Sequence, residues 1–260
     1  MDSIFLDLPR RAPKPRAEGL TMVIDNGLPH RAFADAIEMN APYIDVVKFG
    51  WGTALVTPDI ERKFELLRTM GISYYFGGTL FEKFVAQNRF ESFMTLCRLC
   101  GCAMVEVSNG TITMSNTEKA TYISRCAEEF PVVSEVGFKD QGRSERFGAR
   151  EWVDAIAQDL AAGAERVITE ARESGRSGIC DAAGRPRTEL VDAIVDSGID
   201  PSRLIFEAPN KDLQTYWIML LGTNVNLGNI APGDLVGLET LRLGLRSDTL
   251  VHFEEVASCA

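Results

Sequence analysis

The feature that most constrains the fold of this chain is a regular alternation of short apolar segments with amphipathic ones. The apolar segments are mostly rich in Val, Ile, Phe or Tyr, as expected of parallel strands covered by helices. The predicted strands are Leu20–Asp25, Tyr43–Phe49, Ile72–Phe76, Ala103–Ser108, Val132–Phe138, Arg166–Glu170, Leu204–Glu207 and Asn224–Leu227.

Amphipathic segments fill the intervals between these strands. Proline stands near the start of several of them and glycine directly follows the end of most, which is the usual asymmetry of helix termini. The predicted helices are Pro29–Asn40, Pro58–Met70, Leu80–Cys100, Asn116–Glu129, Arg150–Ala162, Thr188–Ser197, Lys211–Leu221 and Pro232–Leu245.

Eight strand–helix units of roughly 30 residues predict an α/β fold, a single (β/α)₈ TIM barrel over residues 19–260. A doubly wound open sheet is the alternative. Its nucleotide-binding forms lose support because no GxGxxG follows the first strand and no GxxxxGK[ST] occurs. Residues 1–18 are predicted to form a flexible N-terminal arm, with the basic residues of Pro9–Arg16 solvated.

Charge and composition narrow the function. The net charge of −10 and the pI of about 4.9 argue against nucleic acid as a partner. No apolar run reaches the roughly 20 residues of a membrane helix, and no signal peptide is evident. The six cysteines are therefore expected to be reduced thiols of a cytoplasmic protein. A zinc site at Cys97, Cys100 and Cys102 is a weaker alternative, because no fourth ligand lies nearby.

The chain has only two histidines, so its chemistry must rely on other side chains. Four successive predicted strands carry a glutamate near their ends, and alternation along the strands predicts that all four point into the barrel. Lys48, Lys139 and Arg172 share that orientation. Carboxylates that gather where the strands of a barrel end favour a Mg²⁺ site, whereas a purely structural ion-pair network is the alternative. The predicted ligands are Glu106, Glu135 and Glu170, with Glu207, Asp25 and Asn226 as further candidate site residues.

Two connections that follow strands are basic within this acidic chain. Residues 137–150 and 172–187 each contain four basic and two acidic residues. Arginine, serine and glycine together suit a phosphate or sulfonate, although a solvated flexible loop is the alternative. The predicted phosphate-binding residues are Arg172, Ser174, Gly175, Arg176, Gly228 and Asn229, with Arg143 as a further candidate. Lys139 is the best candidate proton carrier, and neighbouring cations and partial burial are expected to bring its pKa toward neutrality.

The chain resembles the phosphosulfolactate synthase family, whose members join sulfite to phosphoenolpyruvate in coenzyme M biosynthesis. The resemblance runs from about Arg16 to about Phe253. It rests on the segments GLTMVIDNGLP, YIDVVKFGWGTA, YYFGGTLFEKF, VEVSNGTI, SEVGFKD, DLAAGAERVITEARESGRSGIC, LIFEAP, GTNVNLGNIAP and LETLRLGLRSDT.

The resemblance implies a Mg²⁺-dependent, trimeric (β/α)₈ barrel of the carbon–sulfur lyase class. The lysine of the family's GFK motif is a general acid and falls on Lys139, while the phosphate contacts would fall on the RESGRSG and NLGNIA segments. Lys48 would help to offset the charge of the two anionic reactants. Two alternatives stay open: a lyase or transferase that uses another nucleophile on phosphoenolpyruvate, and a non-catalytic, stress-related relative.

Overall fold

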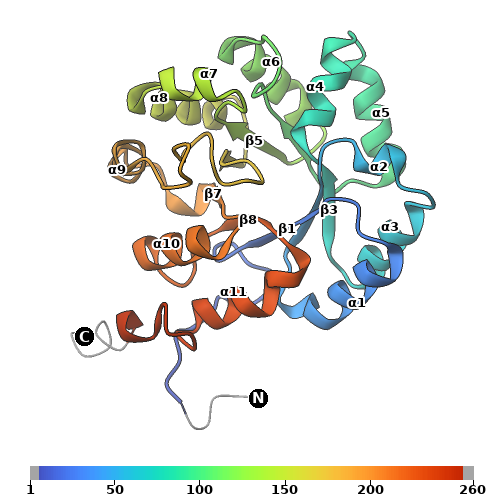
Figure 1. Ribbon diagram of the computed structural model, residues 1–260. Helices are drawn as coiled ribbons and strands as arrows, with labels where there is room; N and C mark the ends of the chain where they lie inside the picture. Colours follow the sequence, from blue (N-terminus) through green and yellow to red (C-terminus); the bar gives the residue numbers. More distant parts are fainter. Residues whose placement is uncertain (1–5, 254–260) are drawn as a thin grey trace.

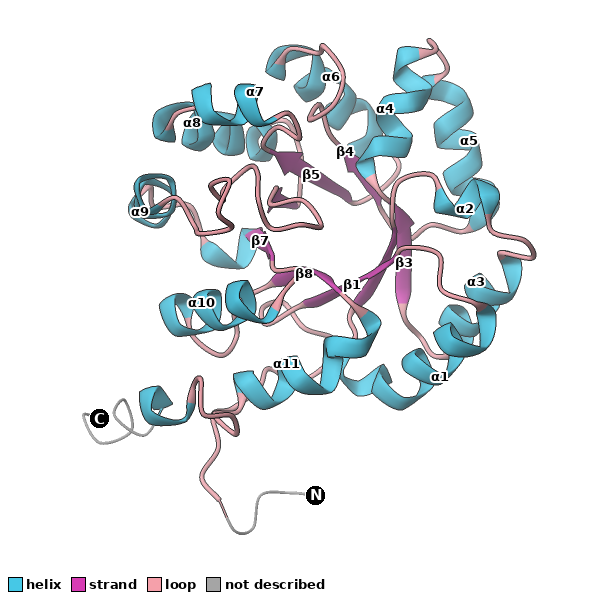
Figure 2. Ribbon diagram, viewed as in Figure 1, coloured by secondary structure: helices cyan, strands magenta, loops and turns pink. Residues whose placement is uncertain are grey.

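Eight parallel strands form a nearly closed barrel surrounded by helices in the computed structural model, which describes residues 6–253 (Figures 1 and 2). The strand order is β3-β2-β1-β8-β7-β6-β5-β4, so the first and last strands of the chain pair and close most of the circle. At the remaining seam between β3 and β4, Ala103 N–H donates to the carbonyl oxygen of Tyr74 at 3.0 Å. The predicted (β/α)₈ barrel is confirmed.

The elements occur in the order expected of repeated strand–helix units. The strands are Thr21–Asp25 (β1), Val46–Phe49 (β2), Ser73–Phe76 (β3), Val105–Val107 (β4), Val132–Val136 (β5), Arg166–Thr169 (β6), Leu204–Glu207 (β7) and Leu227–Ile230 (β8). The helices are His30–Asn40 (α1), Thr53–Val56 (α2), Glu61–Thr69 (α3), Gly78–Ala86 (α4), Phe90–Cys100 (α5), Asn116–Ala127 (α6), Gln141–Arg146 (α7), Ala149–Ala161 (α8), Thr188–Asp196 (α9), Lys211–Leu221 (α10) and Leu235–Arg242 (α11).

Most predicted elements are present with shifted or shortened ends, α2 and α7 were not predicted, and two elements differ more substantially from the sequence prediction. The helix expected over Leu80–Cys100 is broken, because Asn88 adopts a left-handed conformation (φ 57°) between α4 and α5. The last strand lies at Leu227–Ile230 rather than Asn224–Leu227. Gly228 led to this error, because glycine is typical of turns. In the structure, the absence of a side chain at Gly228 makes room for Met22, whose Cε would lie 2.5 Å from a Cβ at this position.

The barrel interior is divided into an apolar lower layer and a charged upper layer. A separate apolar cluster inside the barrel contains Met22, Val46, Tyr75, Val133, Ile168 and Ile205. Two residues further along four of these strands, the inward positions become Lys48, Glu135, Glu170 and Glu207. Strand alternation therefore carries the charged side chains to the end where the strands terminate. A larger apolar cluster packs the outer face of the strands against the helices.

The N-terminal segment packs against the barrel. Arg11 pairs with Glu239 at 2.9 Å and donates to the side-chain oxygen of Asn224 at 2.8 Å, while Arg16 pairs with Asp45 at 3.0 Å. The prediction that these basic side chains are solvated is wrong. Buried carboxylates and carbonyl oxygens at this end of the barrel need donors, and the two arginines supply them. Residues 1–5 of the predicted arm lie outside the described residues.

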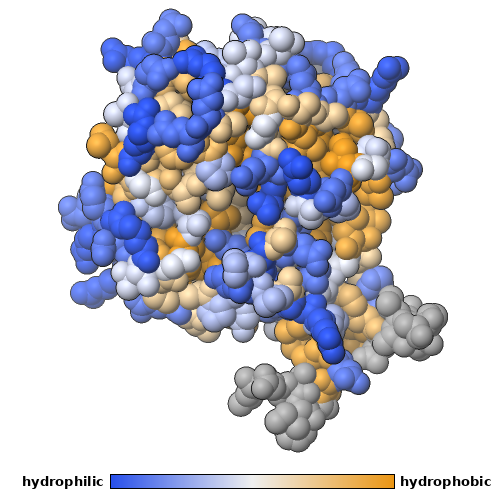
Figure 3. Space-filling view, turned by 180° about the vertical axis from the view of Figure 1, so that it is seen from behind, coloured by the Kyte–Doolittle hydropathy of each residue, from blue (hydrophilic) through white to orange (hydrophobic). Residues whose placement is uncertain are grey.

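The surface opposite to that of Figure 1 mixes hydrophilic and hydrophobic residues, with more hydrophobic surface along one side (Figure 3, right). Helices α8, α9 and α10 lie on that side of the barrel. Val195, Met219 and Leu220 on α9 and α10 expose large apolar side chains. Within residues 6–253, no helix is long and apolar enough to cross a membrane.

Candidate active site

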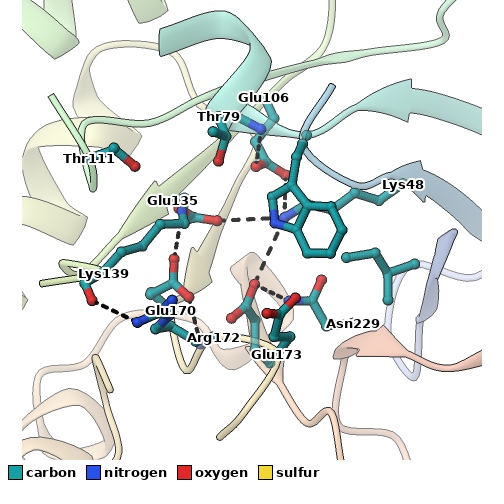
Figure 4. A pocket seen from close by; sticks show the side chains of 15 residues that line it. Lys48, Thr79, Glu106, Thr111, Glu135, Lys139, Glu170, Arg172, Glu173 and Asn229 are labelled. Carbon is teal, nitrogen blue, oxygen red and sulfur yellow. Dashed lines mark hydrogen bonds and ion pairs between the residues drawn. The ribbon is translucent and has the colours of Figure 1, made fainter. Parts of the chain in front are cut away.

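A cavity of about 230 Å³ opens at the end of the barrel where the strands terminate, directly above the apolar layer. Its walls are mainly charged, because residues from successive strand ends converge there (Figure 4). Lys48, Glu106, Glu135, Lys139, Glu170, Arg172, Glu207 and Asn229 all line it. The structure therefore brings the four predicted glutamates into one cavity, and it places Lys48, Lys139 and Arg172 beside them.

Lys48 is the central cation of this site. It lies on β2 and is 5% exposed. Its Nζ is 3.0 Å from Glu106, 3.5 Å from Glu135 and 3.8 Å from Glu207. The ammonium group thus joins carboxylates from three strands that are not neighbours of β2 in the sheet.

Lys139 is the second cation and is closer to the solvent. It follows β5, and its Nζ is 2.6 Å from Glu135 and 2.8 Å from Glu170. Its side chain is 23% exposed, whereas both carboxylates are 2% exposed. Its backbone N–H donates to the Gly110 carbonyl oxygen at 3.2 Å. The ammonium group of Lys139 is therefore held by two buried carboxylates and is still accessible from the cavity. A proton donor requires both properties.

Three of the glutamates are also held by amide donors, and one of them, Glu170, accepts from the Arg172 N–H at 2.5 Å. Glu106 accepts from the Gly78 N–H at 2.5 Å, at the first residue of α4. Glu207 accepts from the Ala171 N–H at 2.7 Å and from the side-chain amide of Asn229 at 2.5 Å. These contacts orient the three carboxylates. Glu207 accepts two amide donors, so it has less freedom to change partners than Glu135.

The carboxylates have opposing pKa shifts. Burial and the neighbouring carboxylates Glu135 and Glu207 raise the pKa of Glu170 well above its usual value. Burial likewise raises the pKa values of Glu106 and Glu207 against the attraction of Lys48. Although burial acts in the same direction on Glu135, Lys139 and Lys48 outweigh it and lower the pKa of that carboxyl. Four carboxyl groups thus compete for two ammonium groups.

The same contacts correct one prediction about Lys139. Burial disfavours its charged form, but the attraction of Glu135 and Glu170 raises its pKa well above the usual value. The expected fall toward neutral pH is therefore wrong for the free protein. The expectation gave weight to nearby cations in the sequence, whereas the folded chain places two carboxylates beside the ammonium group.

The oxygen-bearing side chains of the cavity suit Mg²⁺ in both their chemistry and their charge. Carboxylate oxygens are the preferred ligands of this ion, and the four glutamates exceed the two lysines by two charges when all are ionised. The side-chain oxygen of Asn229 is a further donor, since it is buried without a hydrogen-bond partner among residues 6–253. Within the same residues, no three acidic, His or Cys side chains converge on one metal-sized point, because lysines lie between the glutamates.

The predicted phosphate-binding residues separate into two groups. Arg172 and Asn229 line the cavity, and both have left-handed backbone conformations. Arg176 instead lines a second, neighbouring cavity, whereas Ser174 and Gly175 line neither. Gly228 lies lower, against Met22 inside the barrel. The structure therefore brings two of these six residues to the glutamates.

Three further candidates have other contacts. Asp25 is buried, pairs with Lys63 at 2.6 Å and accepts two backbone N–H groups. Asn226 joins β1 to β7 through the Leu20 N–H and the Leu204 carbonyl oxygen, since it precedes β8 rather than lying within it. Arg143 lies on α7 with its guanidinium 4.0 Å from the ring centre of Phe138. None of the three lines the cavity.

The sequence comparison identifies the family. Residues 9–248 match the model of the (2R)-phospho-3-sulfolactate synthase (ComA) family. The chain belongs to this family. The phosphosulfolactate synthase of Bacillus subtilis is 53% identical over 249 residues, covering 96% of this chain and 99% of that protein. The enzyme of the same name from Methanothermobacter thermautotrophicus is 39% identical over 246 residues, covering 93% and 95%.

Structural comparison supports the fold at much lower identity. A 3-hexulose-6-phosphate synthase superposes with a TM-score of 0.54 at 12% identity, covering 86% of this chain and all of that one. The YdjI aldolase of Escherichia coli gives a TM-score of 0.53 at 12% identity, covering 93% and 91%. These likenesses show the barrel alone.

Several residues of this family member's cavity were missed by sequence reasoning. Trp51, Thr79, Thr111 and Glu173 line it beside the predicted residues. Each follows a strand by a few residues, which is the available signal, because connections at this end of a barrel form the active site. Thr111 lies in the connection after β4, and a buried glutamate anchors that connection.

Glu82 on α4 is the anchor. One carboxylate oxygen accepts the Ser108 hydroxyl at 2.6 Å, and the other accepts the backbone N–H groups of Thr111 and Ile112 at 2.8 and 2.7 Å. We expect Glu82→Gln to lower the free energy of unfolding by about 1–3 kcal/mol. The NH₂ of the glutamine amide would face hydroxyl or N–H donors in a buried site, and these donors would lose their acceptor. Urea unfolding measures this change. The exposed, ion-paired Glu65→Gln is the matched control and should unfold like the wild type; equal stability of the two variants would contradict the anchoring role.

The two basic connections are packed together. The Ser177 hydroxyl donates to the Phe138 carbonyl oxygen at 3.0 Å, and the Gly178 N–H donates to the Ser144 hydroxyl at 2.9 Å. Arg172 also donates to the Lys139 carbonyl oxygen at 3.3 Å. The alternative of a solvated flexible loop is therefore not supported for residues 172–178. Their contacts with the connection after β5 help to position Lys139.

Proposed function

We propose that this chain is a phosphosulfolactate synthase, which adds sulfite to phosphoenolpyruvate to give (2R)-phospho-3-sulfolactate. Membership of the family supports the activity. The observation that carries it is the placement of the buried Lys48 and the partly exposed Lys139 among four glutamates in one cavity, with Arg172 at its edge. Such a set attracts a small, multiply charged anion while supplying a proton donor.

In the proposed reaction, the sulfur lone pair of sulfite forms a bond to the methylene carbon of phosphoenolpyruvate. The electrons of the carbon–carbon double bond move to the adjacent carbon and its carboxylate. Lys139 Nζ then transfers a proton to that carbon, so the product gains one proton and no group leaves. Lys48 and Arg172 offset the repulsion between the two anions.

We further propose that Mg²⁺ assists this addition. Glu106, Glu135 and Glu170 are the proposed ligands. Glu207 accepts two amide donors, one on each carboxylate oxygen, which favours an orienting role for it. When bound, Mg²⁺ would stabilise the negative charge that develops on the carboxylate of the intermediate. Binding of the ion is expected to release protons, since the pKa values of Glu106 and Glu170 are raised in its absence.

The substrate phosphate is proposed to lie near Arg172 and Asn229. Both residues line the cavity, and a guanidinium group suits a phosphate dianion. The family resemblance also motivates a homotrimer, and the exposed apolar side chains on α9 and α10 offer one surface for such contacts.

Phosphorus NMR tests the activity directly. Protein, Mg²⁺, phosphoenolpyruvate and sulfite are expected to yield a new phosphomonoester signal that requires sulfite and disappears with a chelator. A product formed without sulfite would favour another nucleophile on the same substrate. No product at any Mg²⁺ concentration would contradict the proposed activity and favour a non-catalytic relative.

A further inference from the structure

Unfavourable backbone conformations cluster around the cavity. Among residues 6–253, five residues other than glycine have a left-handed φ: Trp51 (49°), Asp59 (50°), Asn88 (57°), Arg172 (59°) and Asn229 (55°). Three of these five, Trp51, Arg172 and Asn229, line the same cavity. Residues with a Cβ rarely adopt this conformation unless the surrounding structure imposes it.

Trp51 is the most unusual of the three. Asparagine tolerates the left-handed region, whereas a bulky aromatic residue does not. The backbone around it is held on several sides: Gly50 N–H donates to the Asp25 carbonyl oxygen, Gly77 N–H to that of Phe49, and Thr53 N–H to that of Gly50. Glycine would fit this position with less strain. The presence of tryptophan therefore calls for a role of its side chain.

The lining of the cavity indicates that role. Ile24 and Trp51 are the two lining residues with large apolar side chains. The other lining residues are charged, or are glycine, threonine or the amide Asn229. Trp51 is 39% exposed, while Trp152 and Trp217 are fully buried. An indole that is partly accessible and borders a charged cavity can cover a bound ligand and exclude water from it.

We propose that Trp51 is a substrate-contacting residue, whose indole forms with Ile24 the apolar wall against which the methylene end of phosphoenolpyruvate lies. This proposal rests on the function proposed above. The phosphate and carboxylate of that substrate require cations, which Lys48, Lys139 and Arg172 supply. Its one apolar part is the methylene group, so it matches the one apolar wall.

Alanine and glycine at position 51 separate the side chain from the backbone. Both Trp51→Ala and Trp51→Gly should raise the KM for phosphoenolpyruvate by at least about fivefold, because both remove the wall. Trp51→Gly should melt at a higher temperature than Trp51→Ala, because glycine relieves the left-handed strain. Asn88→Gly is the matched control: it changes a left-handed residue outside the cavity and should leave KM unchanged.

Tryptophan fluorescence adds a readout that a merely structural role would not move. Titration of the wild type with phosphoenolpyruvate should change the emission, and the change should vanish in Trp51→Phe, which still binds the substrate by calorimetry. If the wild type binds phosphoenolpyruvate while Trp51→Ala keeps its KM and the emission stays constant, the role of Trp51 is overturned and the proposed function survives. If calorimetry detects no binding to the wild type, both proposals fall.

Discussion

Lys139→Ala is expected to reduce turnover by roughly 10²- to 10⁴-fold, the usual contribution of a positioned proton donor. The Lys139 ammonium group is the one that contacts both Glu135 and Glu170 at the open side of the site. Without it, the carbanion formed by sulfite addition has no protein-held proton to accept. Initial rates of sulfite-dependent product formation measure the loss.

The fold should survive this substitution, because the two carboxyl groups can share a proton once the lysine is gone. Circular dichroism and the melting temperature check that the variant is folded. Lys83→Ala, which removes an exposed lysine from α4, is the matched control and should keep full activity. Activity of Lys139→Ala within a few-fold of the wild type would show that another group donates the proton.

Lys48→Met is expected to lower the free energy of unfolding by about 3–5 kcal/mol at neutral pH and to abolish most activity. The ammonium group lies among Glu106, Glu135 and Glu207, and its removal leaves buried carboxylates without their main compensating charge. Urea unfolding measures the stability. Lys211→Met, which removes an exposed ion-paired lysine, should change little.

The deficit of Lys48→Met should depend on pH. In the wild type, burial disfavours the charged form of Lys48, but the three carboxylates outweigh it and raise its pKa above the usual 10.5. The stabilising effect of the ammonium group is therefore complete below that pH. In the variant, the folded-state pKa values of Glu106 and Glu207 rise further above the usual 4.5. The contribution of these two groups to its stability is then greatest below the usual pKa of 4.5 and is lost as the pH rises from there through the raised values.

The measurement compares wild type and variant at pH 5.5 and pH 8. We expect a smaller difference in the free energy of unfolding at pH 5.5, where a larger share of the raised-pKa carboxyl groups is protonated than at pH 8. The double variant Lys48→Met/Glu106→Gln should recover part of the loss at pH 8, since one unpaired charge is removed with the lysine. A pH-independent deficit without such recovery would mean that packing, and not charge, explains the effect.

Most of the barrel was predictable from local patterns. Strands such as Val132–Val136 are short, valine-rich segments between amphipathic helices, and that periodicity needs no long-range information. The last strand was misplaced because Gly228 and Asn229 look like turn residues. Only their packing, against Met22 and Glu207, shows that the chain is extended there. Such packing partners are more than 20 residues away in the sequence.

The site was predictable in its membership but not in its contacts. The alternation from Val133 to Glu135 and from Ile168 to Glu170 directs both glutamates into the barrel. The pairing of each lysine with particular glutamates depends on distances across the barrel. A pattern along the sequence does not contain those distances. The direction of the Lys139 pKa shift was mispredicted for that reason.

The (β/α)₈ barrel, the family and the layer of glutamates and lysines at the strand ends could all be deduced from the amino-acid sequence alone. These features follow from the period of two along strands and from strand-end position, both of which are local. The tertiary structure decided that Lys48 joins three carboxylates, that Arg11 and Arg16 are anchored on the barrel, and that Trp51 borders the cavity. These features depend on where distant segments meet, because electrostatic and packing energies are set by separation in space and not along the chain.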